Sequence, residues 1–303
     1  MIADSVMPDL AYFVLLVADG ALAGSIYALV ALAFVVVYKA SRMINFSAGE
    51  WTMLGARTAA AASHTFGLGL GGAVAVGCAG MVALALVFNR IVLRPLLQSS
   101  LLALIMLTLG VGIFMRGAAT LVFAGIPGRI ASPFPPEPLV VGGVPLSVDK
   151  LVAAAIATAC IAALSWFFHG SRTGLALRAV ASDQQVALAV GIDLHRHFAI
   201  TWALVGVLSV VAGTLWSFVS GGGFGIELLG FKVFPIVILG GLDSLPGTII
   251  GAFAVGILES LVAGYVDPIV GGGFSHVASY LVLIATLFVR PWGLFGRPDV
   301  ARV

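Results

Sequence analysis

Four ionisable side chains stand within otherwise apolar stretches of the sequence: Glu50, Arg57, Arg116 and Glu259. Charged groups are costly inside a lipid bilayer, so they usually face the interior of a helix bundle or a water-filled path. Glu50 and Arg57 are seven residues apart, which places them on one helix face about two turns from each other. Two simpler interpretations stay open: Glu50 could lie at the membrane surface near Arg42, and Arg116 could extend its long side chain to that surface.

The sequence contains none of the common catalytic or nucleotide-binding motifs, such as HExxH, a Walker A lysine or paired cysteine and histidine ligands. Cys78 and Cys160 both lie inside apolar runs, as small buried residues do. His195 and His197 are two residues apart, which is the wrong spacing for ligands on one helix face. We therefore expect no catalytic residue, no metal site and no bound cofactor, and any energy source must belong to another chain. The few ionisable groups do not form a proton relay, which argues against an ion-coupled pump.

Composition decides the class of protein. Of the 303 residues, 61% are hydrophobic and 9% are charged, whereas soluble domains carry about 25% charged residues. The mean hydropathy is +1.15. No soluble fold can cover this much apolar surface, so the solvent must be lipid. The net charge of +2 is too small to indicate a nucleic-acid partner. We predict an all-α, polytopic membrane protein of about eight transmembrane helices, one or two of them discontinuous or re-entrant.

The longest stretch that a bilayer could not accommodate runs from Arg172 to Leu194, between the apolar runs 151–168 and 198–220. Its apolar residues return at roughly helical spacing, and Gly191 stands where a helix stop is expected. This pattern predicts an amphipathic helix that rests on the membrane face and can be held by another protein. The simpler interpretation is a solvated helix that only joins two spans.

Two other regions have the interrupted pattern of a discontinuous helix. In the segment 43–66, polar residues and glycine crowd the first turns, and Asn45 could serve as an N-cap. The apolar piece 233–242 is followed by Ser-Leu-Pro-Gly and then by a second apolar piece, 248–263. Irregular backbone of this kind is tolerated in a membrane only beside protein or a water-filled cavity. The long run 10–38 could likewise tilt, or break near Gly20.

The remaining apolar runs are predicted to be ordinary spans, and the segments between them are short. The additional spans are expected at 68–89, 100–124 and 276–289. The segment 125–149 contains six prolines and is too short to hold a core. We interpret it as an extracytoplasmic loop, so that residues 1–303 form a single transmembrane domain.

Basic residues predict the orientation, because loops rich in Lys and Arg stay in the cytoplasm. We place the N-terminus outside and treat 231–264 as a hairpin that returns to its own side. Three basic residues are then external: Arg129, Lys150 and Lys232. Ten are then cytoplasmic: Lys39, Arg42, Arg90, Arg94, Arg172, Arg178, Arg196, Arg290, Arg297 and Arg302. This asymmetry favours a cytoplasmic position for the segment 169–197.

Four motifs stand in an order that resembles one family of transport proteins. They are the stretch 20–56 with Gly20, Gly24, Ser25, Tyr27, Ala28, Leu29, Asn45, Phe46, Gly49 and Glu50, the stretch 172–194, LGGLDSLPGTIIGA at 239–252, and RPWGLFG at 290–296. Together they resemble the ABC-transporter permeases of the branched-chain amino acid type, the LivH/LivM group. The length of the chain is more similar to the LivH-type subunit than to its LivM-type partner.

The resemblance implies an importer in the bacterial inner membrane. This chain and a sister LivM-type permease would form the path, two cytoplasmic ATPases would bind ATP, and a periplasmic binding protein would deliver the solute. The implied cargo is a branched-chain amino acid or a related small solute such as urea, an amide or an aromatic acid. Departures from the family pattern at Ser47, Ala48, Arg57, Asp243 and Asp19 leave the solute open.

The resemblance also implies two sets of site residues. The ATPase-coupling set is Arg172, Arg178, Ala179, Asp183, Ala187 and Gly191, in which the polar side chains would contact the ATPase and the small ones would allow close approach. The substrate-pathway set is Asn45, Phe46, Ser47, Gly49, Glu50, Gly240, Gly241, Ser244 and Gly247, expected near mid-membrane at the broken helices. A channel or ion-coupled carrier would explain the spans but not a coupling helix, and a membrane-embedded enzyme would need a catalytic cluster.

Overall fold

The computed structural model describes residues 9–96, 99–135, 137–141 and 144–296. The predicted cytoplasmic residues Arg297 and Arg302 lie outside this range. The helices are α1 Asp9–Ser41, α2 Ala48–Phe66, α3 Leu70–Phe88, α4 Arg94–Leu96, α5 Leu101–Val122, α6 Val148–Gly170, α7 Arg172–Ser182, α8 Gln184–Ala189, α9 Leu194–Ser220, α10 Leu229–Gly240, α11 Leu245–Tyr265, α12 Asp267–Val270 and α13 Phe274–Val289. A π-helix covers Asn89–Leu93, a 3₁₀ helix, η2, covers Phe224–Leu228, and the strands β1 Leu139–Val141 and β2 Val144–Leu146 pair antiparallel.

Six helical segments in the described residues are long and apolar enough to cross a membrane, which confirms the polytopic all-α fold. They comprise α1, α3 with its continuation to Leu96, α5, α6, α9 and α11. The polar α2 packs against α3 and α9, and the shorter apolar α13 packs against α10 and α11. These two helices are not among the six candidate spans of the described residues, so the predicted number of about eight stays a prediction.

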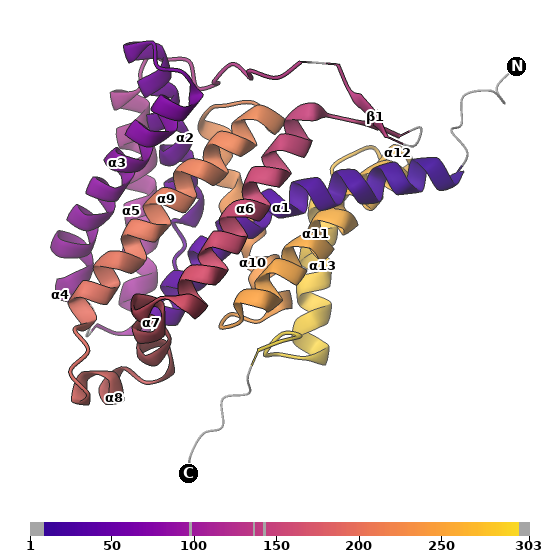
Figure 1. The fold of residues 1–303 in the computed structure, drawn as a ribbon. Helices are drawn as coiled ribbons and strands as arrows, with labels where there is room; N and C mark the ends of the chain where they lie inside the picture. Colours follow the sequence, from indigo (N-terminus) through magenta and orange to yellow (C-terminus); the bar gives the residue numbers. More distant parts are fainter. Residues whose placement is uncertain (1–8, 97–98, 136, 142–143, 297–303) are drawn as a thin grey trace, which may run out of the picture.

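The bundle has two distinguishable ends. Figure 1 shows α7 and α8 together at one end, which we name the α8 end, with the turn between α10 and α11 nearby. The strand β1 and the short helix α12 lie at the opposite end, which we name the β1 end. The loop 125–149 is therefore not wholly irregular, because it carries the β1–β2 hairpin.

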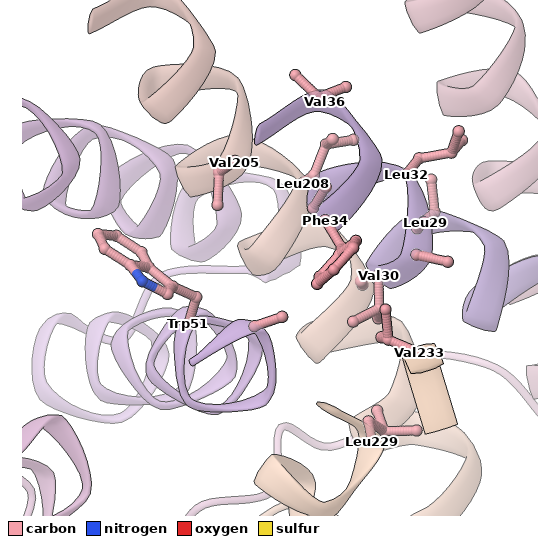
Figure 2. Close-up of a cluster of buried hydrophobic side chains, with 14 of the residues drawn as sticks. Leu29, Val30, Leu32, Phe34, Val36, Trp51, Val205, Leu208, Leu229 and Val233 are labelled. Atoms are coloured by element: carbon pink, nitrogen blue, oxygen red, sulfur yellow. The ribbon is translucent and has the colours of Figure 1, made fainter. Parts of the chain in front are cut away.

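The helix α1 is the centre of the bundle. Residues 26–37 of α1 are all buried, and α1 packs against α6, α9, α10 and α11. Figure 2 shows the resulting cluster, in which side chains from α1, α2, α9 and α10 meet. The helix is unbroken, so the alternative of a break near Gly20 is wrong. A Cβ at Gly20 would lie 2.6 Å from the carbonyl oxygen of Gly256 in α11, so only glycine allows this approach.

Helix α2 begins inside the bundle instead of at its surface. The chain leaves α1 at Ser41, and residues 42–47 return toward the middle before α2 starts at Ala48. The backbone N–H of Phe46 donates to Thr108 Oγ1 of α5 over 3.2 Å. The predicted N-cap is wrong, because Ser47 occupies the N-cap position. Asn45 acts one step earlier, since its Oδ1 accepts the backbone N–H and the hydroxyl of Ser47.

The second interruption lies between α9 and α11 and has two parts. After α9 the chain forms the short helix η2 and then the twelve-residue α10, so this crossing is discontinuous, but its break precedes α10 whereas the predicted one followed residue 242. Gly49 of α2 and Gly230 of α10 pack back to back, since a Cβ on Gly230 would lie 2.6 Å from the Gly49 nitrogen. The broken start of α2 therefore crosses the broken start of α10.

The turn between α10 and α11 lies at the α8 end, not at mid-membrane. Gly241 has a φ of +99°, which glycine adopts readily, and Ser244 caps α11 by accepting the Gly247 N–H. Asp243 and Ser244 line the same cavity as Arg178 of α7. The predicted mid-membrane position of Gly240, Gly241, Ser244 and Gly247 is therefore wrong. Two short half-helices were expected there, but α11 has 21 residues and is a full span.

Candidate functional site

The segment expected to be one helix consists of two, and Asp183 is the reason. Asp183 ends α7, and its carboxylate accepts the backbone N–H groups of Gln185 and Val186 at 2.8 and 3.0 Å, which starts α8. An N-cap side chain that satisfies free N–H groups stabilises a new helix start. Gly191 has a φ of +85° and ends the segment as predicted, while the Ile192 N–H donates to the Ala187 carbonyl.

One side of this segment packs on the bundle. Leu177 and Val180 of α7 are buried, and a Cβ on Gly174 would lie 2.3 Å from the carbonyl oxygen of Phe167 in α6. Ala187 is only 2% exposed, so it packs within the chain and offers no close approach to a partner. Arg172 starts α7 and is exposed, while Ala179 is half-buried. The predicted contact role of Ala187 is therefore wrong, because helix packing covers it.

The other side of the segment exposes apolar residues, which the sequence prediction missed. Leu175, Val186, Leu188 and Val190 are exposed by 55 to 71%. We name these four exposed residues and the exposed Asp183 the α7–α8 face. The helical spacing of the apolar residues predicted an amphipathic helix. That spacing does not indicate which of these residues the bundle covers and which stay exposed.

A cavity of about 1010 Å³ separates α7 from the end of α1, the α10–α11 turn and the segment after α13. The cavity is lined by Lys39, Arg42, His169 and Arg178 and by the acidic Asp243. These positions agree with the predicted grouping of basic residues at one end. Arg178 therefore faces this cavity within the chain, and its Nε is buried without a hydrogen-bond partner.

In the second half of α5, Arg116 joins two acidic residues from separate elements. Arg116 Nη2 donates to Glu50 Oε1 of α2 over 2.9 Å, and its Nη1 lies 3.8 Å from Glu227 Oε1 of η2. The Glu50 and Glu227 side chains are 12% and 11% exposed, whereas that of Arg116 is 43% exposed. Gly112 lets the carboxylate approach, because a Cβ there would lie 3.2 Å from Glu50 Cδ. We name these three charged residues the Arg116 cluster.

The cluster decides between the earlier interpretations of its members. Glu50 does not lie near Arg42 at the surface, and Arg116 is held by an ion pair instead of extending to the surface. The formal charge of the three groups is −1 when all are ionised. Sequence patterns gave no signal for Glu227, since it follows a glycine-rich turn that looks like a surface loop.

Arg57 shares a face with Glu50 as predicted, but it has no acidic partner in the described residues. Its Nη2 donates to the carbonyl oxygens of Phe123 and Ile126 at 2.8 and 3.0 Å. The guanidinium carbon also lies 4.7 Å from the centre of the Phe224 ring. Carbonyl dipoles and an aromatic face can stabilise a buried guanidinium. Arg57 therefore ties α2 to the end of α5 and to η2, next to the cluster.

A second, mostly buried ion pair joins α10 to α11. Lys232 Nζ donates to Glu259 Oε2 over 2.7 Å and to the Tyr27 hydroxyl over 2.9 Å, while Ser279 donates to Glu259 Oε1 over 2.6 Å. The predicted external position of Lys232 is therefore wrong. The pair fixes α10 to α1, α11 and α13. Both oxygen atoms of the Glu259 carboxylate accept hydrogen bonds.

The structure brings together one half of the predicted pathway set. Asn45, Phe46, Ser47, Gly49 and Glu50 surround the broken start of α2 beside the Arg116 cluster. The other half, at residues 240–247, lies at the α8 end near the coupling set. Arg116 and Glu227 are the residues that sequence reasoning left out of the pathway set.

Comparison with known proteins decides the family. The family model described as "Branched-chain amino acid transport system / permease component" matches residues 16–289. The chain belongs to this family. The permease protein LivH of Escherichia coli strain K12 is 31% identical over 311 residues, covering 96% of this chain and 98% of LivH. The permease protein BraD of Pseudomonas aeruginosa is 29% identical, covering 98% of this chain and all of BraD.

A more distant relative is the probable permease LivH of Methanocaldococcus jannaschii, which is 28% identical and covers 88% of each chain. Among solved structures, PsaBC from Streptococcus pneumoniae in complex with Fab has a TM-score of 0.49 and 16% identity, covering 90% of this chain and 91% of that chain. The family and the apolar helices make the chain a multi-pass protein of the bacterial inner membrane. Permeases of this family work with ATPase and substrate-binding partners.

Proposed function

We propose that this chain is one of two permease subunits of an ABC importer that carries a branched-chain amino acid, or a related small polar solute, into the cell. Its sister would be a LivM-type permease, two ATPases would bind ATP in the cytoplasm, and a periplasmic protein would deliver the solute. The family membership and the names of LivH and BraD support the substrate class. No cofactor is required on this chain itself.

The α7–α8 face is the observation that carries the proposal. Leu175, Val186 and Leu188 expose apolar surface next to charged residues at the end of the bundle. A contiguous exposed apolar surface beyond the membrane indicates a protein contact. We place this face in the cytoplasm, where the basic residues of the α8 end belong by the positive-inside rule. There it would fit a cleft on an ATPase.

The packing of α7 would transmit a movement of the ATPase into the bundle. Gly174 brings α7 against the end of α6, and the Arg42 side chain connects α1 with the Ala181 carbonyl. A shift of the α7–α8 face would therefore act on α1, the central helix, and bias a two-state equilibrium between outward and inward forms. The broken starts of α2 and α10 would lie in the path.

The test is co-expression of the chain with two ATPases, a LivM-type permease and a periplasmic binding protein from the same organism. We expect the five proteins to purify together and to concentrate radiolabelled leucine in proteoliposomes only when ATP is hydrolysed. Urea, short amides and aromatic acids would be tested in the same assay. Concentrative uptake by the chain without the ATPases would contradict the proposal and would indicate a carrier driven by an ion gradient.

A further inference from the structure

Arg116 presents a charged group on an exposed face of α5, within a helix that is long and apolar enough to cross the membrane. Its side chain is 43% exposed, and Ile113, one turn away on α5, is 74% exposed. An arginine facing lipid inside the membrane is strongly unfavourable. The exposed face around Arg116 must therefore meet water or another protein in the assembled transporter.

The guanidinium of Arg116 has hydrogen-bonding capacity that the described residues do not use. A guanidinium carries five N–H donors, yet within the described part of the chain that of Arg116 makes one hydrogen bond, to Glu50. The Glu227 oxygen is 3.8 Å away, beyond hydrogen-bond length, and the Nε of Arg116 is buried without a partner. A planar guanidinium with open donors is suited to a carboxylate, which it can bind through two parallel hydrogen bonds.

The surroundings of Arg116 suit the other end of an amino acid. Glu50 and Glu227 are mostly covered, so they hold the guanidinium in place and do not fill its exposed side. Within the cluster the two carboxylates outweigh the single arginine by one negative charge, and Arg57 beyond it is held by the carbonyl oxygens of Phe123 and Ile126. An ammonium group close to the cluster is therefore favoured, while a solute with only a carboxylate gains less.

We propose that Arg116 binds the carboxylate of the amino acid within the membrane, while Glu50 and Glu227 position the arginine and attract the ammonium group. The proposal rests on the proposed function and names the residue that recognises the zwitterion within the path. Sharing the arginine with Glu50 keeps the binding weak, which allows the solute to leave.

The experiment replaces Arg116 with cysteine in a chain in which Cys78 and Cys160 are alanine, after that background has been shown to transport normally. The complete transporter is reconstituted, and uptake and ATP hydrolysis are measured with the loaded binding protein. We expect R116C to lower uptake about tenfold or more, the scale of one charged hydrogen bond. ATP hydrolysis should stay within about twofold of the background, because the α7–α8 face is unchanged.

Chemical modification of the cysteine at position 116 then distinguishes the effect of the positive charge from the effect of side-chain volume. Aminoethylation of R116C restores a cation and should recover most of the uptake, whereas methylthiolation restores volume only and should recover none. The matched control is I113C on the same exposed face of α5, where neither reagent should alter uptake beyond about twofold. Equal recovery with both reagents would overturn the proposal.

A neutral cluster guards against misfolding. The variant E50Q/R116Q/E227Q removes all three charges of the Arg116 cluster, so no carboxylate is left without its cation, and we expect it to assemble normally and to transport poorly. Normal uptake by E50Q/R116Q/E227Q or R116C overturns the role of Arg116 while leaving the importer intact. Loss of the sister permease from R116Q would also overturn it, by making Arg116 an intersubunit contact. Failure of the unmodified transporter to move any amino acid would instead contradict the proposed function.

Discussion

Arg42 donates a hydrogen bond from Nη2 to the carbonyl oxygen of Ala181 over 3.3 Å, which links the end of the central helix α1 to α7. Arg42 is also the one non-glycine residue with a positive φ, +56°, among the described residues. A left-handed conformation costs an L-residue about 1–2 kcal/mol. Glycine at this position would avoid this backbone cost, but it would lose the side-chain contact with Ala181.

The hydrogen bond of Arg42 to Ala181 predicts that a substitution can lower transport without lowering the stability of the complex. Replacing Arg42 with glycine removes the side-chain contact and the backbone strain together. We expect Arg42→Gly to maintain or raise the thermal unfolding temperature of the complex while lowering uptake at least about twofold, because α7 then moves less tightly with α1. Arg196→Ala is the control, since Arg196 is exposed at the same end. Unchanged uptake by Arg42→Gly would show that the contact between Arg42 and Ala181 has no role in coupling.

Asp183 predicts a difference between a helix cap and a charge. Asparagine can cap a helix nearly as well as aspartate, whereas alanine costs about 1 kcal/mol. If the α7–α8 break matters for coupling, Asp183→Asn should retain most ATP-driven uptake, and Asp183→Ala should lower the amount of solute moved per ATP hydrolysed. Equal loss in both variants would show instead that the carboxylate itself contacts the ATPase.

The control for Asp183 is a second aspartate that caps a helix nearby. Asp193 accepts the backbone N–H groups of His195 and Arg196 at the start of α9. The N–H of Arg196, and then that of His195, lowers the pKa of this carboxylate below its ordinary value. Asp193→Ala removes a comparable cap outside the α7–α8 break, so solute moved per ATP should stay near normal.

Lys232 and Glu259 give a prediction about stability. Breaking a buried ion pair leaves an uncompensated charge and costs about 3–5 kcal/mol, whereas removing both charges costs much less. Lys232→Met should therefore lower the thermal unfolding temperature of the purified permease by several degrees. Lys232→Met with Glu259→Gln should recover most of that loss. Full stability in the single variant would mean that water reaches Glu259.

The sequence was sufficient for features that depend on neighbouring residues. Spans follow from local hydropathy, the stop at Gly191 follows from a glycine after a helical pattern, and the interrupted regions follow from glycine and proline among apolar residues. The shared face of Glu50 and Arg57 follows from helical periodicity alone. These predictions hold because each needs only a few turns of chain.

Features that depend on distant partners were not predictable in the same way. Glu50 and Arg116 are 66 residues apart, and Lys232 and Tyr27 are 205 apart, so no local pattern indicates either pair. The depth of residues 240–247 was wrong for a related reason. A glycine-rich break looks alike at mid-membrane and at the surface, and only the length of α11 and its packing on α1 distinguish the two positions.

Gly256 gives the sharpest prediction about packing, because α1 and α11 approach each other through glycine. A Cβ on Gly256 would lie 2.5 Å from the Gly20 carbonyl oxygen and 2.8 Å from the Gly24 Cα, and both are backbone atoms that cannot rotate away. In a membrane, close packing of helices replaces the hydrophobic effect as the main source of association. Overpacking at such a contact typically costs about 1–3 kcal/mol.

Gly256→Ala should therefore lower the unfolding temperature and Gly256→Val should reduce the yield of monodisperse complex. Gly80→Ala in α3, where a Cβ meets no atom within 4 Å, should change neither quantity. Equal behaviour of Gly256→Ala and Gly80→Ala would mean that α1 and α11 separate easily, and α1 could then not serve as the rigid element that carries motion from α7 into the bundle.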